Sequence, residues 1–502
     1  MFLHLLLFLL FINSATSQIP RNLIQEYIKT HADFSINPCD DFFSHVCPAD
    51  KGRDFIKRLV DLEQDILKRH RRMYLGDRDT SKNATLKAVN NLKAFMNSSD
   101  GEHLCEYHPN IFYTLLENNV KNTSSSCSEN VKLARESDFA ILTTLKTMLS
   151  GGWEHTIVNM ELSTTDKKVH DFYKELKDLV REEFEKTPWA LNKKVLDKFV
   201  KALNELSVVT IADYREAFLK TLDDYQWELE RCELLLAGSS FSSQVISTIC
   251  DALAVTQALN KMESIPNLWP DLPLDFSVAA MRSVAEGTFA ANLEMNTPKN
   301  RTLRVLILGN PFILLSNTNY PSDLYGGIGT VIIHEIMHSF VFHDKDLSDL
   351  KPFWSNDTDC VKKQMIKSCG TFPSSKCLNS SYTFEEDAAD MAAYRLAWKA
   401  YQQSVNQLKG LETGYESLDQ KQLFFYSFAT IFCQKWHTSD HNDTHSSFHH
   451  RINSVMSQMN EFFDVFQCKE SDRMVQNRAD YCVIYGEDAP ETKMLGEKKT
   501  FF

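Results

Sequence analysis

The segment YGGIGTVIIHEIMHSF, residues 325–340, constrains the fold and chemistry of this chain more than any other part of its sequence. Residues four apart on an α-helix lie on one face, so the imidazoles of His334 and His338 can converge on one zinc ion. Glu335 follows the first histidine and would project beside the ion, where its carboxylate could take a proton from water. The preceding glycines and the apolar neighbours favour a buried helix. The segment therefore predicts a zinc site, and the alternative is a core helix with two coincidental histidines.

A third zinc ligand is expected elsewhere, because a catalytic zinc ion takes three protein ligands and leaves one position open. The segment FEEDAADMAAYRLAWKAY predicts a helix over residues 383–401 with acidic side chains in its first turns. Glu386 and Asp390 are four residues apart, so Glu386 could bind the metal while Asp390 accepts a hydrogen bond from a ligand imidazole. Glu385 is a competing ligand. Thr383 and Glu386 also fit a capping box, which would only satisfy helix amides.

The later stretch HNDTHSSFHHRIN contains His445 and Arg451 among its polar side chains. Attack of an activated water on a carbonyl group creates an oxyanion, which needs cationic or hydrogen-bond donor groups beyond the metal. This stretch supplies such groups. The alternative is a solvent-exposed polar loop, and we favour that interpretation for His441, His449 and His450.

Bulk properties place the chain among acidic globular proteins with more than one domain. Its 502 residues exceed the usual size of a single hydrophobic core, and 43% hydrophobic and 24% charged residues are ordinary globular values. The net charge of −13 argues against nucleic-acid binding.

The N-terminus, MFLHLLLFLLFINSATSQ, predicts a signal peptide over residues 1–17, because its apolar run is too short to cross a membrane and small residues follow it. No other stretch approaches membrane-spanning length, so no stable membrane insertion is expected. Twelve cysteines without a C-x-x-C pair predict disulfides. Together with glycosylation sequons they predict a secreted, extracellular glycoprotein. The sequons lie at Asn83, Asn97, Asn122, Asn300, Asn356, Asn379 and Asn442.

The chain changes character near residue 270. Residues 18–270 show mostly helical periodicity, with two amphipathic helices separated near Thr187 and Pro188, and carry no catalytic motif. We interpret this region as a helical scaffold or lid, and residues 271–502 as the catalytic domain. Residues 300–315 predict an edge strand that lines a cleft. The expected fold class is therefore mainly α with small β elements, in two lobes.

Taken together, these motifs resemble the neprilysin family of zinc metallopeptidases, which includes the endothelin-converting enzymes. The family's Y-G-G-I-G and H-E-x-x-H-x-F, then E-N-x-A-D, then D-x-H-x-x-x-x-x-R occur here in order, with Asp387 in place of the asparagine. The segment CDDFFSHVC, residues 39–47, and a final C-V-I-Y resemble the family's C-x-D-F-F-x-x-x-C and C-x-x-W. The resemblance covers both ends of the mature chain and nearly all of its C-terminal half.

The resemblance implies a thermolysin-like catalytic lobe with a helical lid lobe, one zinc ion per chain, and hydrolysis of oligopeptides before hydrophobic residues. It implies that His334, His338 and Glu386 bind the zinc ion and that Glu335 is the general base. Asp390 would orient a ligand imidazole.

Four further residues receive roles from the resemblance. His445 would stabilise the tetrahedral intermediate, and Asp443 would lie near that histidine. Arg451 would grip a substrate carbonyl, and Asn292 would hold the substrate backbone. The implied disulfides, which would tie the N-terminal segment to the catalytic domain, are Cys39–Cys468, Cys47–Cys433 and Cys369–Cys482.

Other cysteine pairings stay open. Cys360 and Cys377 could form a further local bridge. The cysteines without an assigned partner are Cys105, Cys127, Cys232 and Cys250.

The chain also departs from the family. It is shorter, with the loss in the lid region, and residues 339–341 read Ser-Phe-Val where the family has Gly-Phe-Asp, so that Asp344 would have to substitute for the aspartate. These departures motivate the alternative of a catalytically weak or inactive relative that binds peptides. A secreted glycoprotein with a structural zinc ion is a third alternative, which three ligands with one open position disfavour. The natural peptide and the oligomeric state stay open.

Overall fold

The computed structural model describes most of the 502-residue chain. The described residues are 20–49, 54–75, 95–96, 99–110, 112, 126–127, 129, 132, 140–190, 193–263, 274–285, 290–296, 302–341, 360–372, 377, 380, 382–408, 418–434 and 444–489. The predicted signal peptide and all seven sequons lie outside them.

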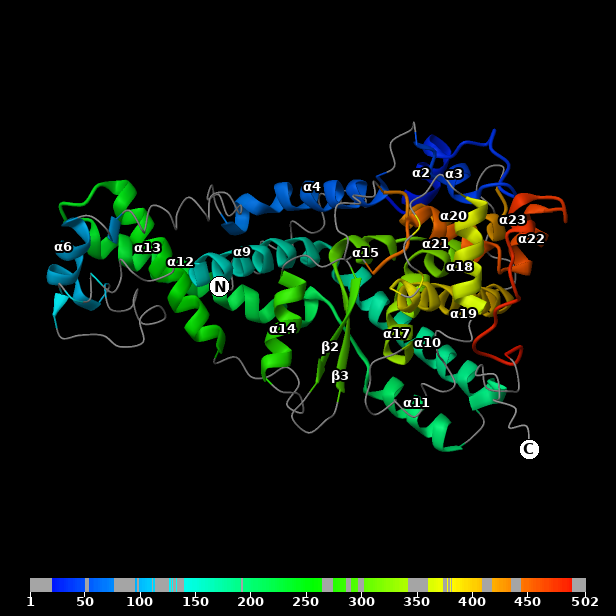
Figure 1. The fold of residues 1–502 in the computed structure, drawn as a ribbon. Coiled ribbons are helices and arrows are strands. Elements are labelled where there is room, and N and C mark those ends of the chain that lie inside the picture. The colour runs from blue at the N-terminus through cyan, green and yellow to red at the C-terminus, as the bar shows by residue number, and fades with distance from the viewer. Residues whose placement is uncertain are drawn as a thin grey trace. The chain divides into compact units, whose positions relative to one another are not determined.

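The described chain is mainly α-helical with one small sheet, which confirms the predicted fold class (Figure 1). It divides into two compact units. The first comprises Met1–Glu63, Thr164–Val208 and Phe289–Phe502, and the second comprises Gln64–Ser163 and Val209–Thr288. The compact units therefore do not follow the predicted linear boundary near residue 270, because segments from both halves of the sequence build the first unit.

The first unit contains all the helices that carry the predicted site residues. Helix α4 (Phe55–Leu75) begins in this unit and continues in the second. The other elements of the first unit are α2 (Leu23–His31), α3 (Phe42–Val46), α10 (Ser163–Lys186), η2 (Pro188–Ala190), α11 (Lys193–Glu205), β1 (Ser207–Val209), β2 (Ala290–Asn296), β3 (Thr302–Leu308), α15 (Asn310–Leu315), α16 (Pro321–Asp323), η4 (Leu324–Gly329), α17 (Thr330–Val341), α18 (Cys360–Thr371), α19 (Phe384–Leu408), α20 (Gln420–Ile431), α21 (Phe448–Met456), α22 (Asn460–Phe466) and α23 (Arg473–Gln476).

The second unit is helical and contains none of the predicted site residues. Its helices α12 and α13 form a pair that the Cys232–Cys250 disulfide closes. The Trp153 indole of α9 donates a hydrogen bond to the Thr221 hydroxyl of α12 (3.1 Å). The elements of this unit are α6 (Ser99–Tyr107), α9 (Ala140–Glu161), η3 (Ile211–Tyr214), α12 (Arg215–Leu236), α13 (Ser243–Glu263) and α14 (Leu274–Ala285).

The sheet corrects the prediction of an edge strand over residues 300–315. The strand order is β1-β3-β2, so β3 is the central strand, and β2 pairs with it in antiparallel fashion. Val305 to Leu308 are fully buried, as expected for a central strand. The strand ends at Leu308 because Gly309 and Pro311 begin a short helix, α15, over residues that were predicted as strand.

The Gly-rich segment before the zinc motif allows close packing. Gly326 lies against α20, and a Cβ atom at this position would come within 2.3 Å of the Phe424 carbonyl oxygen. Only glycine fits there. At the other end of α17, the Phe340 ring packs against Phe184 of α10 and Phe199 of α11, with ring centroids 4.8 and 5.4 Å apart. Both ends of α17 are therefore fixed in the core.

Six disulfides join all twelve cysteines. Two are the pairings that the resemblance implies, Cys39–Cys468 and Cys47–Cys433. The pairs left unassigned are Cys105–Cys127 and Cys232–Cys250.

The predicted Cys369–Cys482 bridge is wrong, and so is a bridge between Cys360 and Cys377. Cys482 pairs with Cys360, and Cys369 pairs with Cys377. Cys360 and Cys369 lie near opposite ends of α18, and it is the first end that faces the C-terminal segment. Sequence spacing does not show which end of a helix faces a distant segment.

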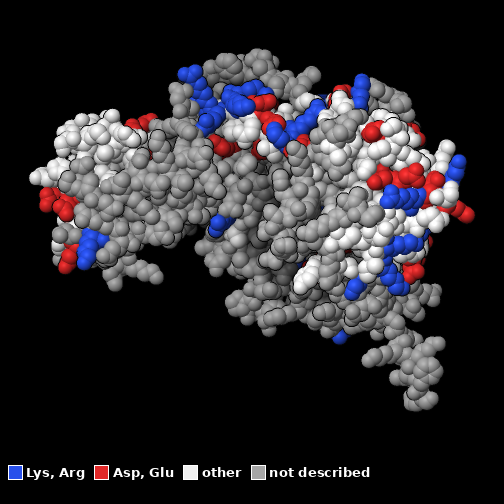
Figure 2. Space-filling view, turned by 45° about the horizontal axis from the view of Figure 1, so that its top comes forward, with Lys and Arg blue, Asp and Glu red and all other residues white. Residues whose placement is uncertain are grey.

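Among the described residues, none of the helices combines the length and apolarity that a membrane crossing requires. On the face shown in Figure 2, Lys and Arg side chains lie interspersed with Asp and Glu side chains.

Candidate metal centre

The predicted zinc ligands converge where α17 packs against α19 (Figure 1). The Nε2 atoms of His334 and His338 lie 2.9 Å apart. Glu386 extends from α19 so that its Oε2 is 3.2 Å from Nε2 of His334 and its Oε1 is 3.5 Å from Nε2 of His338. Their ligand atoms all lie within 4.8 Å of one another.

These three residues fit a zinc ion. Two imidazole nitrogens and one carboxylate oxygen form a donor set that zinc uses in catalytic sites. Glu386 Oε2 lies 3.2 Å from Nε2 of His334 and 3.2 Å from Nε2 of His445. A largely buried carboxylate is costly unless a cation faces it, and a zinc ion held by these donor atoms would supply that charge. The competing ligand, Glu385, is not part of this group.

Asp390 lies behind His334 as an orienting carboxylate should. Its Oδ1 is 2.9 Å from Nδ1 of His334, which leaves Nε2 to face the centre. Arg451 of α21 donates two hydrogen bonds to the same carboxylate, from Nε to Oδ2 (2.6 Å) and from Nη2 to Oδ1 (2.8 Å). The Arg451 guanidinium also lies over the Phe432 ring, 4.9 Å from its centroid. Asp390 is therefore held in one orientation by a buried bidentate ion pair.

The electrostatics of this group follow from burial and close charges. Burial raises the pKa of Asp390, but the charge and hydrogen bonds of Arg451 outweigh it and hold the pKa at about 2. Burial likewise raises the pKa of Glu386, but the facing His334, His338 and His445 bring the pKa well below its usual range. Burial lowers the pKa of His334, but Asp390 and Glu386 raise it to about 10. A metal ion that binds here must therefore displace a proton.

Two further predicted residues belong to this region: Glu335 by its place in α17, and His445 by its contact with Glu386. Glu335 follows His334 on α17 and is buried, with 7% of its surface exposed. His445 comes from the segment before α21, and its Nε2 is 3.2 Å from Glu386 Oε2. Its side chain is 42% exposed, so it lies at the solvent side of the group.

The interpretation of His449 and His450 as residues of an exposed loop is wrong, because both are buried on α21. His449 Nε2 donates a hydrogen bond to Asp41 Oδ2 (2.9 Å), and His450 Nδ1 lies 3.1 Å from the Ser447 hydroxyl. Asp41 is a residue that sequence reasoning missed. The resemblance of the CDDFFSHVC segment to the family marked the part of the chain that contains Asp41. The spacing of that segment does not predict that Asp41 contacts α21.

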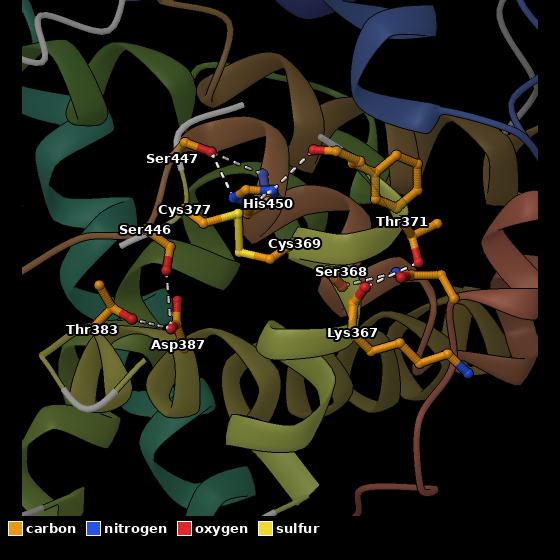
Figure 3. The surroundings of a disulfide bond; sticks show 12 residues. Lys367, Ser368, Cys369, Thr371, Cys377, Thr383, Asp387, Ser446, Ser447 and His450 are labelled. Carbon is orange, nitrogen blue, oxygen red and sulfur yellow. Dashed lines mark hydrogen bonds between the residues drawn. A yellow bond between two sulfur atoms is a disulfide. The ribbon is translucent and has the colours of Figure 1, made fainter. Parts of the chain in front are cut away.

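Asp387, which stands where the family has asparagine, is buried beside the metal ligands. The hydroxyls of Thr383 (2.7 Å) and Ser446 (3.0 Å) both donate hydrogen bonds to its Oδ2 (Figure 3). Burial raises the pKa of Asp387 to about 7, and the nearby Asp390 contributes to the increase. The Thr383 hydroxyl, which the capping-box alternative pairs with a helix amide, donates its hydrogen to the side chain of Asp387.

Four residues that the sequence analysis named are not placed at the centre by the described part of the structure. The backbone of Asn292 lies in β2, opposite Leu306 of β3, and its side chain is not described. Asp443, His441 and Asp344 lie outside the described residues.

Comparison with known proteins agrees with this geometry. Residues 299–482 match the profile of peptidase family M13. The chain is 29% identical to neprilysin-3 of Drosophila melanogaster over 55% of its own length and 39% of the relative's. It is 32% identical to endothelin-converting enzyme 1 of Bos taurus over 32% of its own length and 23% of the relative's. It thus spans well under half the length of these curated relatives. Residues 299–482 are therefore similar to peptidase family M13, a zinc-dependent metallopeptidase family, and the three converging side chains agree with that similarity.

Two solved structures have weaker similarity. A Mycobacterium tuberculosis zinc metalloprotease, Zmp1, in complex with an inhibitor is 14% identical, with 72% of this chain and 52% of the other covered at a TM-score of 0.40. A Haemonchus galactose-containing glycoprotein complex is 15% identical, with 92% and 99% covered at a TM-score of 0.49. We base no conclusion on similarity at this level.

Proposed function

We propose that this protein is a secreted zinc endopeptidase that hydrolyses oligopeptides, with one zinc ion per chain. The observation that carries the proposal is the convergence of His334, His338 and Glu386, backed by the Asp390–Arg451 ion pair. Three protein ligands leave one coordination position open, as in catalytic rather than structural zinc sites. When bound, zinc would supply Lewis acidity to a water molecule and to the peptide carbonyl.

The chain's own residues would carry the proton transfers and the charge. Glu335 would take a proton from water and later pass it to the leaving amine. His445, at the solvent side of Glu386, would donate to the oxyanion that forms on the carbonyl oxygen. Asp390 would keep His334 in the tautomer whose Nε2 faces the metal.

Substrate contacts and surroundings belong to the proposal as well. Following the family resemblance, Arg451 would bind a substrate carbonyl, Asn292 would hold the substrate backbone, and Asp443 would support His445. The cleavage would fall before hydrophobic residues, and the second unit would belong to a reduced lid. Six disulfides support an extracellular location, where disulfides persist.

The test compares wild-type protein with Glu335→Gln on a mixed peptide library, with zinc content measured for both. We expect stoichiometric zinc in both proteins and cleavage by the wild type alone, which a chelator abolishes. Wild-type protein without zinc would refute the proposal. Zinc and peptide binding without turnover would instead identify a non-catalytic peptide-binding relative.

A further inference from the structure

The segment that carries His445 is tied to the helix that carries Glu386 at two consecutive residues. His445 Nε2 is 3.2 Å from Glu386 Oε2, and the next residue, Ser446, donates its hydroxyl hydrogen to Oδ2 of Asp387, the residue after Glu386. Two consecutive residues of this segment therefore contact two consecutive residues in the first turn of α19.

The Asp387 contact is buried, whereas the His445 side chain is not. Thr383, Asp387 and Ser446 are 1%, 2% and 5% exposed, and the His445 side chain is 42% exposed. A side chain that is nearly half exposed gains little positional restraint from packing and depends on how its backbone is anchored. In Figure 3, Thr383 and Ser446 approach the Asp387 carboxylate from two segments.

The residue after Ser446 is anchored as well, and to a different element. Ser447 caps α21, where its hydroxyl accepts a hydrogen bond from the backbone N–H of His450 (3.3 Å). The Ser447 cap fixes the start of α21, and the Ser446 hydrogen bond fixes the approach to α19. Of these two contacts, the Ser446 hydrogen bond is the one that ends on α19, the helix that carries Glu386.

We propose that Asp387 is a positioning residue that holds His445 at the metal centre, by accepting hydrogen bonds from Ser446 and Thr383. This inference rests on the proposed function, since it assigns His445 to the oxyanion. The chemistry requires only an acceptor oxygen at this place, which the family's asparagine also has. Asp387 would therefore act through Ser446 without touching the substrate.

The experiment compares Ser446→Ala, Thr383→Val, Asp387→Ala and Asp387→Asn with the wild type in peptide cleavage. In Ser446→Ala and Asp387→Ala we expect kcat to fall roughly ten- to hundred-fold, since a displacement of about 1 Å costs that much. Thr383→Val should lower kcat less, because the Ser446 contact remains. KM and zinc content should stay unchanged, and Asp387→Asn should keep kcat near the wild-type value.

Ser454→Ala is the matched control. Ser454 is a fully buried serine of α21 whose hydroxyl has no hydrogen-bond partner among the described residues, so its loss should leave kcat unchanged. A second readout does not depend on turnover. Carbethoxylation of His445, followed by peptide mass spectrometry, should speed up several-fold in Ser446→Ala and not in Ser454→Ala.

Unchanged kcat and unchanged His445 reactivity in Ser446→Ala would overturn the inference. An Asp387→Asn protein as impaired as Asp387→Ala would overturn it too, because the acceptor oxygen would then not suffice. If the Asp387→Ala and Ser446→Ala proteins lost zinc to the same extent as kcat, Asp387 would have only a structural role, which would contradict the inference. If the wild type cleaves no peptide, the proposed function fails. The reactivity of His445 would then still show whether Asp387 holds His445 in place through Ser446.

Discussion

The two sides of the metal centre are built in different ways. On one side, α17 and α19 each supply residues four apart along a helix, so local geometry already brings His334 to His338 and Glu386 to Asp390. On the other side, residues 445–451 are held by segments far away in sequence. His449 binds Asp41, Arg451 binds Asp390 and Ser446 binds Asp387. The first side depends on periodicity, and the second depends on tertiary contacts.

The largest effect is expected on the helical side, from Glu386→Gln. An uncharged amide is a poor zinc ligand, so zinc content should fall from one per chain to near zero. Peptide cleavage should drop roughly thousandfold or more, because the metal contributes several kcal/mol to the transition state. Glu385→Gln is the matched control and should keep its zinc. If only Glu385→Gln lost its zinc, Glu385 and not Glu386 would be the third zinc ligand.

The next effect tests the tertiary side through Arg451→Met. This change leaves the Asp390 carboxylate buried without its partner, so the free energy of unfolding should fall by about 3–5 kcal/mol. Zinc affinity should fall about 10–100-fold, because Asp390 no longer orients His334 firmly. Denaturant unfolding and zinc titration measure these effects.

Lys363→Met provides the comparison for Arg451→Met. It removes an exposed ion pair with Asp480, in which both side chains are more than 60% exposed, so the free energy of unfolding should change far less than in Arg451→Met. Equal losses in the two variants would mean that the Arg451 pair is no more important than a surface pair.

The disulfides next to α21 give a third effect, which concerns the free energy of unfolding and not the metal ligands. The Cys360–Cys482 bridge spans 122 residues and the Cys369–Cys377 bridge spans only 8. Loop-closure entropy predicts that the free energy of unfolding falls by about 4–5 kcal/mol when Cys360 and Cys482 are changed to serine. The fall should be less than about 3 kcal/mol when Cys369 and Cys377 are changed. Peptide mapping under non-reducing conditions checks the pairing first. Recovery of a Cys369–Cys482 peptide would restore the pairing that the family resemblance implies.

The smallest effect is the pH dependence of the Asp41–His449 contact. Burial raises the pKa of Asp41, but the hydrogen bond and charge of His449 outweigh it and lower the pKa from 3.8 to about 2. Because the folded state holds the proton less tightly, Asp41 stabilises the fold above its unfolded pKa. That contribution, about 2 kcal/mol, is lost as the pH falls from about 4 to about 2. Asp41→Asn should flatten the slope of unfolding free energy in this window, and an unchanged slope would contradict the contact.

The same contrast explains what the sequence could predict. The convergence of the proposed zinc ligands and of Asp390 follows from helical spacing, and the break between α10 and α11 follows from Pro188. The burial of His449 and His450 could not be predicted, since the partner Asp41 lies 408 residues away and the stretch is polar throughout. The edge-strand prediction failed for a related reason, because the neighbours that make β3 central come from other parts of the chain.

Crystals of the zinc-loaded wild-type protein, measured at the zinc absorption edge, test the central claim most directly. The account predicts one anomalous peak per chain, in contact with Nε2 of His334, Nε2 of His338 and a carboxylate oxygen of Glu386, with one position left open. A peak bound by a fourth protein ligand, or a peak elsewhere in the chain, would contradict it.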